Sequence, residues 1–183
     1  MKLGEINKLV IDRFTPPGAF LKDSIGNEVL LPRKYLLEAY QLEQEIDVFV
    51  FKDSEQRIVS TTEKPHLLLE EFKYLKVTQI QPIGAFVDWG LDKNLLVPYS
   101  EQLYKLEEDE SYLIALKHDK KTDRLYGSMK IKNLLEPCTE DITGEKVKLL
   151  ICEYNDLGIS VIVNKKFEGL IFNSNIISNI NHG

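Results

Sequence analysis

The sequence has 183 residues, of which 43% are hydrophobic and 28% charged, so it is long enough for one or two ordinary domains, or for three small ones. No stretch approaches the roughly 20 apolar residues that cross a bilayer, and residues 1–14 lack the apolar core of a secretion signal, so we expect a cytoplasmic protein with no membrane partner and with reduced cysteines. The formal net charge of −6 argues against strong nonspecific binding to nucleic acid.

The first 63 residues divide into short apolar segments that are separated by turn residues. Alternating and β-branched stretches predict strands at 4–14, 18–23, 28–32, 45–53 and 56–62. A helical segment is predicted at 33–42, between the third and fourth strands.

Residues 64–136 repeat this order, with strands predicted at 71–81, 84–89, 94–98, 110–119 and 124–132 and a short helical turn near 99–106. The repeat has fixed anchors. Gly18-Ala19-Phe20, Leu31-Pro32 and Asp53 return 66 residues later as Gly84-Ala85-Phe86, Val97-Pro98 and Asp119, and Arg57 returns after 67 as Arg124. Several anchors at one offset indicate a duplicated unit.

Residues 137–183 hold a third and weaker copy. Gly158-Ile159-Ser160-Val161 follows Gly84-Ala85-Phe86-Val87 by 74 residues, and Phe172 follows Pro98 by 74. Only the first half of the unit is present, because a helical link and two strands should still follow. We therefore expect either that the chain is a piece of a longer protein or that strands from a neighbouring copy or chain complete this unit.

Three strands, a helical link and two further strands predict a five-stranded Greek-key barrel of the OB type. The fold class is therefore all-β, with tandem barrels at 1–63 and 64–136 and an incomplete third barrel at 137–183. Gly18, Gly84 and Gly158 are predicted at the corner where the first strand bends into the second. The apolar triplet 67–69 is predicted to dock the first two barrels.

The pattern of Gly-Ala-Phe, then a Leu-Pro or Val-Pro pair, then Asp and Arg around a loop resembles the S1 RNA-binding domain. The segments 84-GAFVDWGLDKNLLVP-98 and 154-YNDLGISVIVNKKFEGLI-171, in this order, resemble the bacterial conserved virulence factor B family. The resemblance implies tandem S1 domains, a following winged-helix domain that is missing from this sequence, and post-transcriptional regulation through RNA.

The resemblance also implies an RNA-binding face on the second and third strands. Its positions hold Phe20, Asp53, Arg57, Phe86, Asp119, Arg124 and Phe172. Other aromatic positions of the pattern hold Pro17, Pro32, Ile83, Pro98 and Leu157, and Ser160 replaces the phenylalanine of the third copy. Because each copy lacks some of the aromatic residues on which bases would stack, we expect weak RNA binding unless several domains act together.

The residues themselves add a cationic loop at 117–124, which carries Lys117, Lys120, Lys121 and Arg124. Beside Phe86 and Trp89, such a loop is suited to hold a phosphate backbone near a stacking ring. The alternative is a solvated hairpin tip. The sequence leaves three locations open for Trp89: the barrel core, an interface between domains, or the surface on which bases stack.

No nucleophile–base set, phosphate-binding loop or metal-ligand spacing occurs in the sequence, so we expect no enzyme, no cofactor, no metal and no small-molecule substrate. The leading hypothesis is a regulator that binds single-stranded RNA weakly through several domains. The alternative is a protein-interaction scaffold that contacts ribosome or RNA polymerase components through barrels whose RNA face has decayed.

Overall fold

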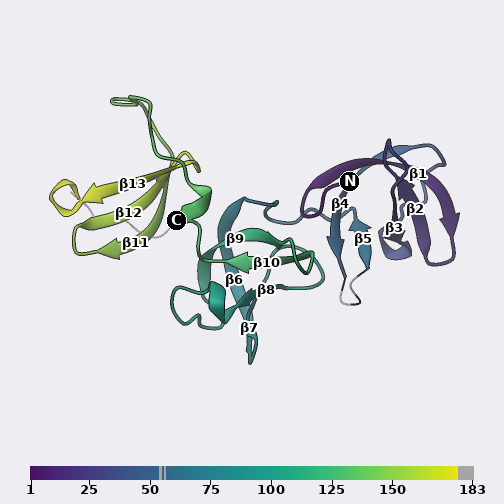
Figure 1. The fold of residues 1–183 in the computed structure, drawn as a ribbon, viewed down its shortest axis with the longest axis horizontal. Coiled ribbons are helices and arrows are strands. Elements are labelled where there is room, and N and C mark those ends of the chain that lie inside the picture. Colours follow the sequence, from purple (N-terminus) through teal and green to yellow (C-terminus); the bar gives the residue numbers. More distant parts are fainter. Residues whose placement is uncertain (54, 56, 177–183) are drawn as a thin grey trace. The chain divides into compact units, whose positions relative to one another are not determined.

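The protein was analysed as a computed structural model that describes residues 1–53, 55 and 57–176 (Figure 1). It separates into two compact units, Met1–Met129 and Lys130–Gly183. The described residues form β-strands joined by turns and by short 3-10 helices, which confirms the all-β prediction. No helix in this described part of the chain is long and apolar enough to cross a membrane.

The first five strands close into a barrel. They are β1 (Ile6–Thr15), β2 (Gly18–Lys22), β3 (Glu28–Pro32), β4 (Glu45–Lys52) and β5 (Ile58–Thr61). The order is β1-β2-β3-β5-β4, closed by antiparallel pairing of β1 with β4. The predicted start of the last strand, Gln56, lies outside the described residues. Alternation places Leu9, Ile11, Leu21 and Leu31 inside the barrel, where their burial drives closure.

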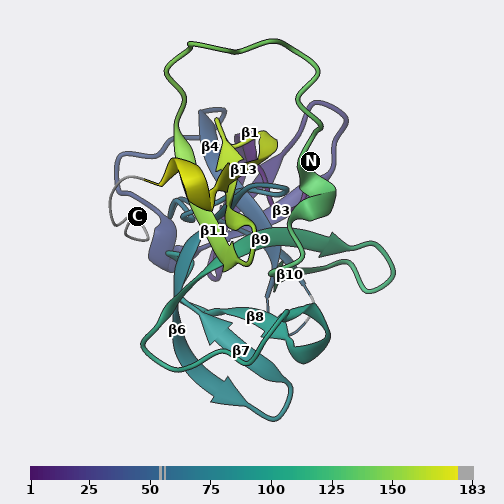
Figure 2. The ribbon, with the colours of Figure 1, turned by 90° about the vertical axis from the view of Figure 1, so that its left-hand side faces the viewer.

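The second set has the same strand order. It comprises β6 (Phe72–Gln81), β7 (Gly84–Val87), β8 (Leu95–Pro98), β9 (Ser111–Asp119) and β10 (Arg124–Ser128). β6 curves, so that its first half pairs with β9 and its second half with β7 (Figure 2). The ends of the order, β8 and β10, approach each other at Gly127, where an added Cβ would lie 2.7 Å from Val97 Cγ2.

The glycine that opens the second strand of each set lies at the predicted corner, directly after the turn from the first strand, and its neighbour on the third strand gives the physical reason. At Gly84 the backbone φ is +147°, and an added Cβ would lie 2.3 Å from the carbonyl oxygen of Val97 on β8. Gly18 and Gly158 have equivalent close approaches to the third strand. The glycine is therefore required by backbone conformation and by contact with the neighbouring strand.

The predicted helix at 33–42 is wrong beyond its first turn. A 3-10 helix covers only Arg33–Tyr35, and its counterpart in the second set covers Tyr99–Glu101. Tyr35, Leu36 and Tyr40 pack on the core of the barrel, but Leu37 is 61% exposed, so the apolar side chains do not form one continuous helical face. Short helices need such a face, and propensity alone did not sustain this one. The strand predicted at 124–132 ends at Ser128 and is followed by a 3-10 helix at Lys132–Leu134.

The linker docks the first two sets of strands through the predicted apolar triplet. Leu67 is buried in a cluster that also contains Phe49 of β4 and Trp89, which follows β7. The Phe49 and Trp89 rings meet edge to face, with centroids 5.7 Å apart. The Leu69 amide donates a hydrogen bond of 2.8 Å to the carbonyl oxygen of Gly4. The docking prediction is thus confirmed by an aromatic core shared between the two sets.

The second unit contains a three-stranded sheet. Its strands are β11 (Leu149–Asn155), β12 (Gly158–Val163) and β13 (Phe167–Phe172), followed by a 3-10 helix at Asn173–Asn175. Ile151, Ile159 and Val161 form its apolar cluster. This half-barrel sheet agrees with the expected half unit, whose predicted residues 177–183 lie outside the described ones. The domain boundaries at 63/64 and 136/137 remain predictions.

Candidate nucleic-acid interface

Each of the three sheets presents an equivalent outer face, formed by the outward residues of its first three strands. The first strand has a β-bulge just before the residue that pairs with the centre of the second strand. The resulting rows are Arg13–Phe20–Leu30, Gln79–Phe86–Leu96 and Glu153–Ser160–Leu170. The predicted aromatic position therefore lies at the middle of each face.

On the outer face of the first barrel, the ring of Phe20 is covered. The Arg13 guanidinium carbon lies 4.2 Å from the ring centroid. Glu28 holds that guanidinium through two bonds of 2.5 and 2.8 Å, and Asp12 binds it at 2.9 Å. Lys22 bonds to Asp12 at 2.8 Å, and this lysine, followed by Arg13, lowers the pKa of the Asp12 carboxyl. The charges of this face are thus paired with one another.

On the outer face of the second barrel, Phe86 lies near uncharged polar side chains, while the Glu108 carboxylate accepts a hydrogen bond of 2.8 Å from the Ile80 amide, next to Gln79. Gln79 lies opposite it on β6, and both Gln79 and Asn94 are exposed. The Asn94 amide donates to Thr78 Oγ1 at 2.7 Å, and the Thr78 hydroxyl donates to the carbonyl oxygen of Phe86 at 3.1 Å. Phe86 is half-buried, so part of its ring is accessible. An accessible ring beside amide groups is suited to stack on a base.

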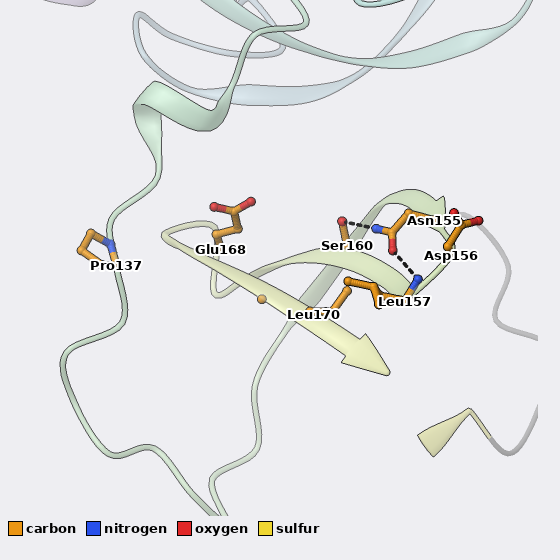
Figure 3. A pocket seen from close by; sticks show the side chains of 8 residues that line it. Pro137, Asn155, Asp156, Leu157, Ser160, Glu168 and Leu170 are labelled. Carbon is orange, nitrogen blue, oxygen red and sulfur yellow. Dashed lines mark hydrogen bonds between the residues drawn. The ribbon is translucent and has the colours of Figure 1, made fainter. Parts of the chain in front are cut away.

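The outer face of the third sheet is acidic and has no ring at its centre. Ser160 occupies that position and accepts a hydrogen bond of 2.9 Å from Asn155, as Figure 3 shows. A pocket of about 660 Å³ is lined here by Pro137, Asn155, Asp156, Leu157, Ser160, Glu168, Gly169 and Leu170. Two carboxylates in this pocket disfavour a phosphate. Phe172 lies at the end of β13 and is 53% exposed.

The predicted Asp53–Arg57 pair closes the hairpin between β4 and β5. Asp53 accepts bonds from the backbone amides of Glu55 and Arg57 and from the Arg57 side chain at 2.9 and 2.7 Å. Asp119 has the same role in the second barrel, where it accepts bonds from Lys121 and Thr122. The hydrogen bonds of both aspartates are therefore explained by the turns that they stabilise.

The cationic loop leaves two lysines in solvent and is joined to the first barrel. Lys120 and Lys121 are exposed at the tip, whereas Lys117 is half-buried and Arg124 opens β10. Asp123 binds His118 at 2.7 Å and Lys52 of β4 at 3.2 Å, and these contacts, His118 first, lower the pKa of its carboxyl. The tip is thereby held while its lysines stay accessible.

Trp89 belongs to the interface between the two barrels. It is 4% exposed, and its indole Nε1 donates a hydrogen bond of 2.5 Å to the carbonyl oxygen of Lys93. Because its ring packs against Phe49, it offers no face to a base. Of the three alternatives, the structure therefore favours the interface. The prediction of Trp89 as an RNA-binding residue is wrong, because its ring is buried.

Sequence reasoning missed Arg13, Glu28, Gln79 and Asn94 as face residues. The signal was present in the repeat, since residues 13 and 79, and residues 28 and 94, are separated by the same 66 positions. The register pairs Arg13 and Gln79 with the central rings, and hydrogen bonds place Glu28 beside Arg13 and Asn94 beside Thr78. Within the described ranges, no group of His, Cys, Asp and Glu side chains is arranged to hold a metal ion.

Comparisons with known proteins agree with this architecture. Residues 3–63 match the S1 domain family. The chain is 30% identical over 150 residues to the uncharacterized protein YitL of Bacillus subtilis, across 79% of this chain and 47% of that protein. It is 27% identical to conserved virulence factor B of Staphylococcus epidermidis, across 63% of this chain and 41% of that protein.

A solved structure has the same fold. It is a multidomain protein with nucleic acid binding domains from Streptococcus pneumoniae, which superposes with a TM-score of 0.60 over 94% of this chain and 63% of that one, at 20% identity. The chain spans less than half the length of the two curated relatives. The chain is therefore a homologue of YitL and of conserved virulence factor B, and residues 3–63 carry an S1 domain. The sequence patterns had indicated the S1 domain and the resemblance to conserved virulence factor B.

Proposed function

We propose that this chain binds single-stranded RNA, and that the outer face of β6, β7 and β8 in the second barrel is its principal contact. The observation that carries the proposal is the half-buried ring of Phe86 directly opposite the uncharged side chain of Gln79. OB-type barrels bind single strands on the equivalent face by stacking bases on aromatic rings. Lys120 and Lys121 supply positive charge for the phosphates.

The proposal gives this chain a binding role without catalysis, in a bacterial cytoplasmic regulator that acts post-transcriptionally or on translation. The S1 domain match supports a nucleic-acid ligand, and so does the similar streptococcal protein, which has nucleic acid binding domains. One accessible ring contributes about 1–3 kcal/mol for each stacked base, so the affinity of a single face is low. Neighbouring domains on the same strand would raise it.

Phe86→Ala should weaken binding to a single-stranded RNA of about 12 nucleotides by roughly 5- to 150-fold, because it removes one stacked base. Fluorescence anisotropy at low salt measures this change. Phe20→Ala is the matched control, since the same ring is already covered by Arg13 in the first barrel, and its effect should be much smaller. Equal losses in the two variants would contradict the assignment to the second barrel.

Replacing both Lys120 and Lys121 with alanine should reduce the salt dependence of binding. Each phosphate contact to a single strand contributes about 0.7 to the slope of log K against log salt, so the double variant should lower that slope by about 1.4. Lys146 and Lys148 are exposed lysines of the second unit and provide a charge-matched double control. An unchanged slope would show that the loop does not contact phosphate.

The second candidate function is a protein-interaction scaffold that contacts ribosome or RNA polymerase components. The self-paired charges around Phe20 favour it, because that face already satisfies its own cations. The acidic face around Ser160 favours it as well. Absence of RNA binding by the intact chain at low salt would support the scaffold and refute the proposed RNA face.

A further inference from the structure

We infer that the second barrel discriminates between bases, and that Gln79 and Asn94 give it a preference for adenine in single-stranded RNA. The inference rests on the proposed function and names its specificity. Gln79 is the direct cross-strand partner of Phe86, and Asn94 precedes β8 on the other side of the same face. Directly opposed side chains have Cβ atoms about 4.5–5.5 Å apart, so Gln79 adjoins whatever stacks on the ring.

The chemistry of these two side chains suits a base edge. A carboxamide has both donor hydrogens and an acceptor oxygen, and it is uncharged. It therefore adds little to the attraction of a phosphate backbone, but it can pair with the complementary donors and acceptors of a base. The characteristic partner of Asn and Gln is adenine, whose N6 amino group and N7 atom form a bidentate contact with the amide. Unstacked bases in single strands expose these edges.

The Asn94 amide is oriented before any ligand arrives. One of its hydrogens is committed to Thr78 Oγ1 at 2.7 Å, and Thr78 is in turn bonded to the carbonyl oxygen of Phe86 at 3.1 Å. The amide is thus tied to β6, and β6 is tied through Thr78 to the β7 strand that carries the ring. Its acceptor oxygen and second hydrogen are the groups that remain for a base. Holding a polar group in place reduces the ordering cost of binding and sharpens discrimination.

The other two faces carry charge at the same positions. Arg13 and Glu28 replace Gln79 and Asn94 in the first barrel and bind each other. Glu153 lies in the row of the third sheet at the position of Gln79. Phe20 and Phe86 are both half-buried, but of these two rings only Phe20 is covered by a cation, so the uncovered ring is also the one beside two amides. We therefore assign the selection of the base to the second barrel. Attraction of the RNA phosphate backbone is a separate contribution.

The test compares oligoadenylate, oligouridylate and oligocytidylate of about 12 nucleotides at one salt concentration. The unaltered chain should bind oligoadenylate at least about fivefold more tightly than the pyrimidine strands, the lower end expected for one good amide–base pair. Gln79→Ala and Asn94→Ala should each reduce that ratio toward one while leaving the salt slope unchanged. Gln41→Ala removes an exposed amide from the loop before β4 and should keep the ratio.

Gln79 is exposed, so its truncation tests the inference even if Asn94→Ala disturbs β8. Equal binding of all three strands by the unaltered chain, with Phe86→Ala still weakening each of them, would overturn the inference and leave the proposed function standing. An unchanged adenine preference in both amide variants would also overturn it. Failure of the unaltered chain to bind any strand would instead refute the proposed function itself.

Discussion

Gly84→Ala should lower the free energy of unfolding of the second barrel by about 3 kcal/mol or more, at the upper end for single substitutions. The added Cβ would lie 2.3 Å from the Val97 carbonyl oxygen and 2.9 Å from the Pro98 Cα. Both obstacles are backbone atoms, so β8 itself must move. The φ of +147° adds a conformational penalty for any residue with a Cβ. Urea unfolding followed by fluorescence of Trp89, the single tryptophan, measures the change.

Gly26→Ala is the matched control for this substitution. Gly26 also has a positive φ, of +86°, but nothing lies within 4 Å of its added Cβ. Gly26→Ala should therefore lower the free energy of unfolding by only about 1 kcal/mol, because only the backbone conformation opposes the new side chain. If the two variants lost equal stability, contact with the third strand would not be the reason for the glycine.

Trp89→Ala should lower the free energy of unfolding of Met1–Met129 by about 3–5 kcal/mol, the range for truncating a large buried aromatic side chain. The indole fills the cluster shared by Phe49 and Leu67, so its loss removes contacts on both sides of the interface. We expect the single unfolding transition of Met1–Met129 to broaden or to split, because the two sets of strands would no longer stabilise each other. Calorimetry of the intact chain detects this change.

Phe14→Ala is the control for the interface variant. Phe14 is a similarly large ring, but it is 46% exposed on β1, so its truncation should change stability much less. Limited proteolysis adds a local measurement, since cleavage within residues 63–72 should accelerate in Trp89→Ala and not in Phe14→Ala. A sharp, single transition in Trp89→Ala would mean that the aromatic cluster does not couple the two barrels.

Much of the strand layout was predictable because it depends on local alternation and on turn residues. The strand at 28–32 was predicted with its observed bounds, and 71–81 and 110–119 each begin one residue early. The helix predicted at 33–42 was wrong beyond its first turn because tertiary contacts override propensity: Tyr35, Leu36 and Tyr40 pack on the barrel core from a largely non-helical segment.

The candidate site was predictable only in part. The repeat placed Phe20 and Phe86 at the same position on their strands, and the register confirms that equivalence. Nothing local to Phe20 shows that Arg13 covers its ring, because the contact depends on a bulge and on Glu28 from a third strand. Whether the two rings contact RNA stays a prediction for the binding experiments.

The sequence by itself determined that this chain repeats a unit of short strands, because strand period, turn residues and glycine positions depend on residues that are close together in the chain. Only the tertiary structure decided which parts of each repeat are accessible. Trp89 is buried in the interface between the barrels, and Asp53 and Asp119 stabilise the hairpin turns. Phe86 is half-buried and lies opposite Gln79 on the neighbouring strand. Burial and pairing depend on side chains that arrive from other strands, and these contacts are invisible in any single stretch of sequence.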